Sequence, residues 1–216
     1  MDAERFLREL PALFDDFPRS GHPRDRRFAD VLERLDGLAC ENNLALVNLA
    51  ASLLAPDECY VEIGTFKGAS LVAAMLGNEE HDFVAVDSFA LAGGSRARLE
   101  TNVRGFGLEP PEILEGDVFE LLHGGALDGR SIGVCYWDLL HKYEPQLAGL
   151  RLLERHLAPG AVVIVDDSDW EGVELALADY FAGQPRARRL LTLGGDRRGQ
   201  PWWWEGVVAY AWDGVV

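Results

Sequence analysis

The residues best suited to chemistry lie where an apolar run ends in a glycine-containing turn and continues into a helix. The run is Cys59–Ile63, the turn contains Gly64 and Gly68, and a helix is expected over residues 69–76. Glycines let backbone amides approach a ligand, and a helix start presents unpaired N–H groups and the positive end of its dipole. This order of elements predicts that the turn binds an anionic or zwitterionic cofactor.

Acidic residues accompany this turn. Asp87 closes the next apolar run, residues 83–86, and Ser88 follows it. Folds that bind nucleotides at such a turn place an acid at about this separation to accept the ribose hydroxyls. Glu62 lies just before the turn, where its charge favours a cationic cofactor.

Three more acids end later apolar runs. Asp138 ends the run over residues 132–138, and Asp166 and Asp167 end the run over residues 161–167. The carboxyl ends of neighbouring parallel strands meet at one edge of a sheet, so these carboxylates should converge and repel one another. A divalent cation with oxygen ligands, Mg²⁺ above all, would relieve that repulsion. The structural alternative is that the acids only line the open end of a cofactor pocket.

A general base is expected close to these acids. His141 follows Asp138 by three residues and has an intrinsic pKa near neutrality, so it is the first candidate. Lys142 is the second. For either residue, a solvated loop charge or a helix-capping partner is the alternative.

The spacing Glu62-x-Gly64-x-x-x-Gly68 differs from the Gly-x-Gly-x-x-Gly fingerprint of dinucleotide-binding folds. Residues 62–70 instead resemble the first motif of class I S-adenosylmethionine (SAM) methyltransferases, and the resemblance extends over roughly residues 57–212. It implies an α/β, Rossmann-like, doubly wound and mostly parallel seven-stranded sheet. A C-terminal antiparallel hairpin and an N-terminal helical extension complete the expected fold.

The resemblance also assigns roles toward SAM. The amides after Gly64 would take its carboxylate, Glu62 would accept from its amino group or shape the turn, and Asp87 would bind the ribose. Asp117, after the third strand, would bracket the adenine, with capping of a helix that starts at Val118 as the competing explanation. The predicted cofactor-binding residues are Glu62, Gly64, Thr65, Phe66, Gly68, Ser70, Asp87, Ser88, Asp117 and Val118.

Residues 165–170 look much like the Asp-Asp or Asp-Asn element of metal-dependent O-methyltransferases that act on catechols, caffeoyl-thioesters and macrolide sugars. Residues 136–144 resemble an Asp-Gly-Asp-His-Ser-Tyr-Glu stretch of a related bacterial group of small-molecule methyltransferases. Leu139 and Leu140 replace its glycine and second aspartate. The resemblance implies that Asp138, Asp166 and Asp167 hold Mg²⁺ or another divalent cation beside a small hydroxylated acceptor.

An alternation of strands and helices must position these residues. Runs that are apolar throughout predict parallel strands covered on both faces, and a loop over residues 194–200 joins the last two. The expected strands are Cys59–Ile63, 83–87, Glu112–Glu115, 132–138, 161–166, 188–193 and 206–212. The helices expected between them are 69–76, Arg96–Gly105, 118–122, 144–156 and 173–181.

Residues 1–56 are expected to form the helical extension, as a cap or dimer contact, and residues 57–216 the SAM-binding core. Apolar positions predict one helix over residues 3–17 and two more over residues 27–54. The run Trp202–Trp204 is best explained by packing at the sheet edge, with an aromatic wall or a dimer contact as alternatives. Trp170, just after the acid pair, is better placed to touch a substrate.

Composition limits the class of protein. The 20 Lys and Arg against 36 Asp and Glu give a formal charge of −16, which disfavours a nucleic acid substrate. Three cysteines indicate free thiols in a reducing compartment, and the charged N-terminus is unlike a signal peptide. With no stretch suited to a membrane span, a cytoplasmic protein is expected. A nicotinamide-dependent oxidoreductase and a non-catalytic SAM-binding protein are the alternative functions.

Overall fold

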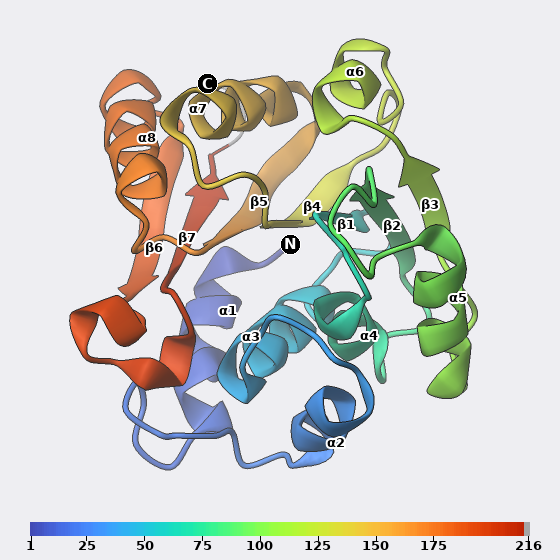
Figure 1. Ribbon diagram of the computed structural model, residues 1–216. Coiled ribbons are helices and arrows are strands. Elements are labelled where there is room, and N and C mark those ends of the chain that lie inside the picture. The colour runs from blue at the N-terminus through green and yellow to red at the C-terminus, as the bar shows by residue number, and fades with distance from the viewer. Residues whose placement is uncertain (214–216) are drawn as a thin grey trace.

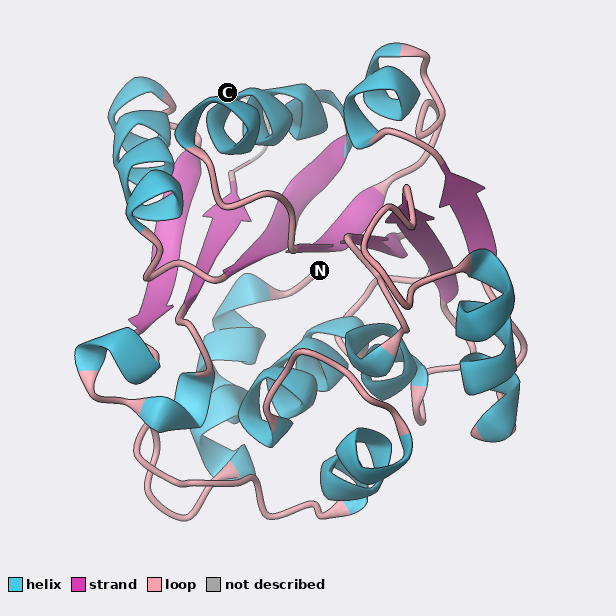
Figure 2. Ribbon diagram, in the orientation of Figure 1, coloured by secondary structure: helices cyan, strands magenta, loops and turns pink. Residues whose placement is uncertain are grey.

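The computed structural model describes residues 1–213, which form a central sheet between two layers of helices (Figures 1 and 2). The sheet has seven strands in the order β3-β2-β1-β4-β5-β7-β6. All neighbours are parallel except β7, which is antiparallel to both β5 and β6. The strands are β1 (Cys59–Ile63), β2 (Asp82–Asp87), β3 (Glu112–Glu115), β4 (Ile132–Trp137), β5 (Leu157–Asp166), β6 (Ala187–Leu193) and β7 (Val207–Trp212).

This topology confirms the predicted Rossmann-like sheet with C-terminal antiparallel strands. The chain order reverses between β1 and β4, and such a reversal leaves a crevice at the carboxyl ends of the strands. The last two strands do not simply extend the edge, because β7 inserts between β5 and β6 and leaves β6 outermost.

Helices cover both faces of the sheet. They are α1 (Ala3–Glu9), α2 (Arg27–Arg34), α3 (Glu41–Ala51), α4 (Ala69–Met75), α5 (Arg96–Gly105), α6 (Val118–His123), α7 (Tyr143–Leu153) and α8 (Glu171–Gly183). Short 3₁₀ helices are η1 (Leu10–Leu13), η2 (Glu154–His156), η3 (Asp196–Arg198) and η4 (Pro201–Trp203). In the view of Figure 1, α6, α7 and α8 lie above the sheet, and α1 to α5 lie below it.

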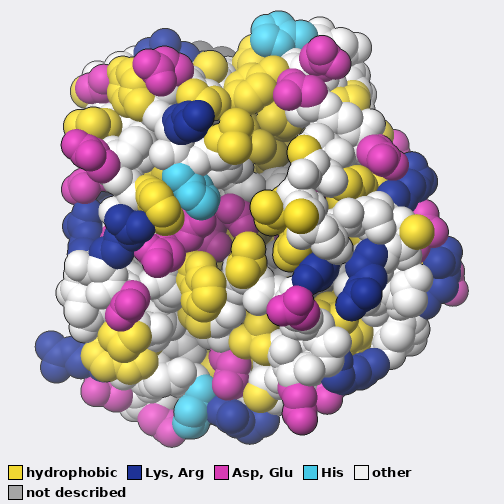
Figure 3. Space-filling model, in the orientation of Figure 1, with side chains coloured by type: hydrophobic (Ala, Val, Ile, Leu, Met, Phe, Trp, Pro, Cys, Tyr) yellow, Lys and Arg dark blue, Asp and Glu magenta, His cyan; other side chains and the backbone are white. Residues whose placement is uncertain are grey.

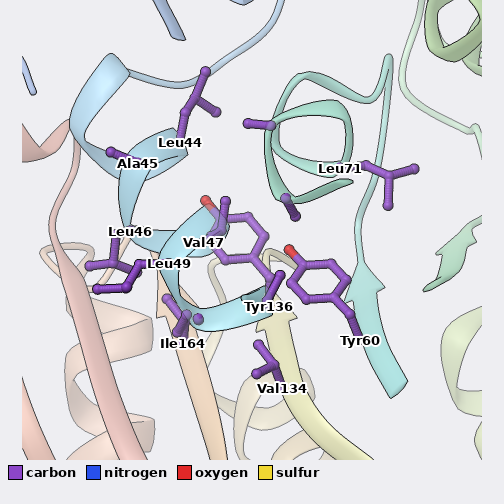
Figure 4. Close-up of a cluster of buried hydrophobic side chains, with 14 of the residues drawn as sticks. Leu44, Ala45, Leu46, Val47, Leu49, Tyr60, Leu71, Val134, Tyr136 and Ile164 are labelled. Atoms are coloured by element: carbon purple, nitrogen blue, oxygen red, sulfur yellow. The ribbon is translucent and has the colours of Figure 1, made fainter. Parts of the chain in front are cut away.

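Two apolar cores result, one on each face of the sheet. Successive residues of a strand point to opposite faces. Tyr60 and Tyr136 therefore join the core between the sheet and α3 and α4. Val61 and Trp137 join the core between the sheet and α6 to α8. Figure 4 shows the rings of Tyr60 and Tyr136 rising from β1 and β4 toward the helix that carries Leu44–Leu49.

The N-terminal residues are packed into the first of these cores. Along α3 every residue from Asn42 to Ala51 is buried, and α3 lies beside α4 against the sheet. Pro11 is the second residue of η1, and the helix expected over residues 3–17 is interrupted after α1 because proline has no N–H to donate. Within residues 1–213, no helix has the length and hydropathy needed to cross a bilayer.

The tryptophan run does not extend a strand, since Pro201–Trp203 form η4 and β7 begins only at Val207. The side chain of Trp203 is buried against Phe14 and Phe17, and its Nε1 donates to the Pro18 carbonyl at 2.8 Å. The expected packing role is therefore correct for Trp203. Trp204 differs, because it lines the cavity described below.

Candidate active site

A cavity of about 710 Å³ opens at the carboxyl ends of β1, β2, β4 and β5, within the size range of small-molecule sites. Figure 3 shows acidic side chains and a histidine gathered near the middle of this face, beside hydrophobic side chains. The predicted site residues that line the cavity are Gly64, Thr65, Phe66, Gly68, Ser70, Asp87, Ser88, Asp117, Val118, Asp138, His141 and Asp167. Glu62, Lys142 and Asp166 are not among its lining residues.

The turn after β1 is folded tightly against the end of β4. Gly64 has φ +89°, and a Cβ built there would lie 1.7 Å from the carbonyl oxygen of Asp138. The Gly64 N–H donates to Val86, and the Asp138 N–H donates to Ile63, each at 2.9 Å. A side chain at Gly64 would therefore separate the turn from β4, which explains the glycine.

The second glycine begins the helix. Gly68 caps α4 in a left-handed conformation, φ +86°, and a Cβ there would meet Leu99 at 2.3 Å. The first amides of α4 thus lie at the edge of the cavity, where they suit a carboxylate.

Asp87 ties two loops of the cavity together. Its Oδ2 accepts from the Phe66 N–H at 2.6 Å, and its Oδ1 accepts from the Phe89 N–H at 2.5 Å. The carboxylate is thereby held at the end of β2 with its remaining lone pairs available to a hydroxyl.

Glu62 lies beneath the turn rather than in the cavity. It is fully buried and accepts from the Tyr60 hydroxyl and the Ser70 hydroxyl, both at 2.9 Å. Burial raises the pKa of Glu62 to about 8, although these two hydrogen bonds act in the opposite direction. These contacts are those of a residue that shapes the turn, and the amino-group role stays a prediction.

Asp117 both caps a helix and lines the cavity. Its Oδ1 accepts from the N–H groups of Phe119 and Glu120, at 2.9 and 3.1 Å, so it is the N-cap of α6. The capping alternative is thus confirmed, while contact with an adenine stays a prediction.

Asp138, His141 and Asp167 form a compact group. Potential metal-ligand atoms of the three lie within 4.8 Å of one another. The His141 Nε2 is 2.6 Å from Asp167 Oδ2 and 3.9 Å from Asp138 Oδ1. Hydrogen bonding to Asp138 and Asp167 raises the pKa of His141 to about 10. His141 therefore carries a proton at neutral pH while both carboxylates face it.

Asp166 points away from this group. Its Oδ1 accepts from Asn43 at 3.1 Å, and its Oδ2 accepts from the Tyr136 hydroxyl. The reason is strand alternation, because Asp166 continues the face of Val162 and Ile164, which packs toward α3. Burial and the nearby charges of Asp138 and Asp167 raise the pKa of Asp166. The structure thus gathers two of the three expected ligands, and the role of Asp166 as a ligand stays a prediction.

Lys142, the second candidate for the general base, is the N-cap residue of α7. It is exposed and does not line the cavity. Trp170 lines the cavity as expected, with its ring 5.0 Å from that of His141 and the Arg197 guanidinium 3.9 Å from its centroid.

Other lining residues were not anticipated. Asn43, which donates to Asp166, was also missed: alternation along β5 indicates the face on which Asp166 lies but does not identify its partner on α3. The unanticipated lining residues include Gly37, Leu38, Ala39, Leu91, Leu139, Leu140, Trp204 and Glu205.

Comparison with known proteins identifies a family. Residues 61–168 match a family model described as a methyltransferase domain. An uncharacterized protein, R132, of Acanthamoeba polyphaga mimivirus is 26% identical over 128 residues, which are 56% of this chain and 57% of the viral protein. The match thus spans little more than half of that relative.

Solved structures share the fold. The O-methyltransferase TomG from Streptomyces achromogenes, involved in tomaymycin synthesis and solved with SAM, has a TM-score of 0.65 and 17% identity. The match covers 99% of this chain and 100% of TomG. CalS11, a TDP-rhamnose 3'-O-methyltransferase of calicheamicin biosynthesis, has a TM-score of 0.58 and 20% identity over 97% of this chain and 94% of CalS11.

Proposed function

Since the chain belongs to the methyltransferase domain family and has the fold of class I SAM-dependent methyltransferases, we propose that it transfers a methyl group to a hydroxyl oxygen of a small molecule. One observation carries the proposal. A single cavity connects the turn from Gly64 to Ser70 with Asp138, His141 and Asp167. The cofactor end and the acid–histidine end therefore open to the same space. Transfer to oxygen is further supported by TomG and CalS11, which are O-methyltransferases.

At the cofactor end, the residues present fit SAM. The amides that follow Gly64 and begin α4 suit its carboxylate, and the Asp87 carboxylate suits its ribose diol. When bound, SAM would supply the methyl carbon, and the electron pair of the broken carbon–sulfur bond would stay on sulfur as the carbon–oxygen bond forms. The chain's own part is to align the acceptor oxygen with that carbon and to accept the hydroxyl proton.

His141 is the residue we propose as the proton acceptor, at Nε2. In the structure this nitrogen is paired with Asp167 and the imidazole is protonated, so His141 must release that proton to solvent before it can accept another. A cation on Asp138 and Asp167 would favour this release, because it would neutralise the charges that raise the pKa of His141. Trp170, stacked beside the ring, keeps it at the cavity wall. Asp138 and Asp167 thus control whether His141 is available.

The donor set also fits a divalent cation, and we propose that Asp138 and Asp167 hold it. Asp167 Oδ1 is buried without a hydrogen-bond partner among the described residues, as expected of an oxygen that awaits a ligand. Asp138 and Asp167 supply hard oxygen ligands, which suit Mg²⁺ or Mn²⁺. Lewis acidity at this position would lower the pKa of an acceptor hydroxyl. A small hydroxylated acceptor is the partner that this arrangement suits.

Calorimetry and turnover assays test the proposal. SAM and S-adenosylhomocysteine should bind whereas NAD should not, and methyl transfer should appear on a panel of phenols, catechols and sugars. Binding of SAM without turnover on any acceptor would favour the alternative of a non-catalytic SAM-binding protein. Absence of binding by both methionine-derived compounds would refute the proposal entirely.

Variants of the two neighbouring acids test the cation separately. Asp167→Ala should bind SAM normally but lose Mn²⁺ binding, followed by calorimetry, and lose any activity that a chelator removes from the wild type. Asp166→Asn is the comparison: it should retain Mn²⁺ binding because this carboxyl faces Asn43 and Tyr136, and loss of binding would instead support the predicted role of Asp166 as a third ligand. Equal turnover of Asp167→Ala and wild type in chelator and in Mn²⁺ would remove the cation from the mechanism.

A further inference from the structure

Trp204 has a backbone conformation that glycine usually adopts. Its dihedral angles are φ 55° and ψ −121°, and the Gly206 N–H donates to the Trp203 carbonyl at 2.9 Å. Residues 203–206 thus form a turn with the geometry of type II′, in which Trp204 occupies the first central position. Glycine is strongly preferred there because a side chain is strained at positive φ. A tryptophan in this place is unfavourable for the backbone.

Contacts around the turn maintain the strained conformation. The Ser168 N–H donates to Gly206 at 3.0 Å, and the Asp169 N–H donates to Glu205 at 2.9 Å. Trp204 is therefore fixed relative to the segment that directly follows Asp167. Strained residues that their surroundings hold in place are concentrated at functional sites. Since glycine would suit this backbone better, the reason for a tryptophan here must be sought in its side chain.

Trp204 lies at the proposed acceptor space. Trp204 and Glu205 line the same cavity as Asp138 and Asp167. The neighbouring indoles are already engaged, Trp203 in the core and Trp170 with His141 and Arg197. Within the described residues, no stacked ring or cation–π contact involves Trp204.

The rim of the cavity is apolar. Leu38, Leu91 and Leu140 are 59%, 56% and 59% exposed, and all three line the cavity. Large aliphatic side chains that remain exposed around one cavity mark a binding surface for an apolar ligand.

The charges of the cavity are mostly negative. Its lysine, Lys67, is ion-paired with Asp36 at 2.7 Å and is not available to an anion. The acidic lining therefore favours positive charge, which the sulfonium of SAM and the proposed divalent cation would provide. The acidic residues that line the cavity are Asp87, Asp117, Asp138, Asp167 and Glu205.

We infer that Trp204 is a specificity-determining residue that stacks on the acceptor, and that the acceptor is a hydroxylated molecule with a planar, apolar ring. The inference rests on the proposed function, since it concerns the acceptor of that reaction. An aromatic pair contributes about 0.5–1.5 kcal/mol beyond the area that it buries, so a planar aromatic diol is preferred to a saturated diol of similar size.

Binding rather than turnover is the suitable test, because phenols and alcohols differ in reactivity. With S-adenosylhomocysteine present, calorimetry compares a dihydroxynaphthalene with the corresponding dihydroxydecalin. The wild type should bind the planar diol at least about tenfold more tightly, and Trp204→Gly should lose about tenfold in its affinity. Trp204→Phe should recover most of the loss. Trp202→Gly removes a nearby indole that does not line the cavity, and it should bind the planar diol like the wild type.

Thermal stability distinguishes a role of Trp204 in recognising the acceptor from a role in packing the fold. Because glycine suits the turn, Trp204→Gly should keep or raise Tm and leave the Kd of S-adenosylhomocysteine unchanged. A fall in Tm, or unchanged affinity of this variant for the planar diol, would overturn the inference while leaving the proposed function intact. Absence of S-adenosylhomocysteine binding in the wild type would overturn both.

Discussion

Adjacent carboxyl groups in this protein have different surroundings because a strand alternates its side chains. Asp166 still belongs to β5 and faces α3, where Asn43 and Tyr136 donate to it. Asp167 lies beyond the strand with φ 55° and turns into the cavity, where it meets His141. The pair that sequence reasoning treated as one metal-binding unit therefore divides into a buried residue and a cavity residue.

The same alternation buries Glu62 on the face of β1 that also carries Tyr60. Because Glu62 is buried, its ionisation should change the stability of the protein with pH. Its pKa is about 8 in the folded protein against an ordinary 4.5, so the folded state binds the proton more tightly than the unfolded chain. The resulting contribution is complete below about pH 4.5 and is lost as the pH rises to about 8. Glu62→Gln cannot ionise, so its free energy of unfolding should fall less over this interval, by about 1.4 kcal/mol for each pKa unit.

Urea titrations at several pH values measure this effect. The free energy of unfolding of Glu62→Gln minus that of the wild type should be larger near pH 8 than near pH 4.5. Glu120→Gln, at an exposed position of α6, should follow the wild-type curve. Parallel curves for Glu62→Gln and wild type would show that the buried carboxyl does not titrate in this range.

Residue types and spacing identified many of the residues that line the cavity around the β1–α4 turn, because a glycine turn and the acids that end neighbouring parallel strands meet at one edge of the sheet. They left open whether Asp117 caps α6 or contacts the cofactor, and they did not reveal that Trp204 lines the cavity. Trp204 depends on a turn in which a tryptophan occupies a glycine position, and no local preference predicts that. Asn43 was missed because its partner, Asp166, is distant in sequence.

At the scale of elements, strands with strong apolar character were predicted well, β1 and β3 to the residue. The start of β5 was placed too late because Pro159 and Gly160 indicate a turn, whereas Leu157 already pairs with Ile132 of β4. Tertiary pairing outweighs the local signal there.

The β1–α4 turn allows a direct test of how closely two elements approach. Gly64→Ala should lower the stability of the protein by more than about 1 kcal/mol and abolish SAM binding, because its methyl group would collide with the Asp138 carbonyl. Gly107→Ala is a matched control, since Gly107 also has positive φ, +76°, but a Cβ there meets nothing within 4 Å. Thermal unfolding and calorimetry of both variants give the comparison. Similar losses in the two variants would mean that backbone strain alone, and not the approach to β4, explains the glycine.

Substitutions of Asp117, at the start of α6, distinguish helix capping from contact with the cofactor. Asp117→Ala removes the acceptor for two amides and should cost about 0.5–2 kcal/mol. Asp117→Ser can still cap the helix, so it should restore the free energy of unfolding without restoring the affinity for SAM. Recovery of both quantities in the serine variant would assign Asp117 to the helix alone.

At the scale of the whole molecule, the cavity connects loops from both halves of the sheet. It is lined by the segments after β1, β2 and β3 on one side and by those after β4 and β5 on the other. A ligand that contacts all of them binds only the folded protein, so its binding energy adds to the free energy of unfolding.

SAM should therefore stabilise the protein as a whole. At a concentration about one hundred times its Kd the gain is about 2.7 kcal/mol, which for a chain of this size raises Tm by roughly 5–11 °C. Differential scanning calorimetry measures the shift, with NAD at equal concentration as the control that should leave Tm unchanged. Asp167→Ala should show the full shift with SAM, because Asp167 belongs to the acceptor end of the cavity. Loss of the shift in this variant would mean that the two ends of the cavity do not act independently, and the assignment of Asp167 to the cation would have to give way to a role in holding the cofactor.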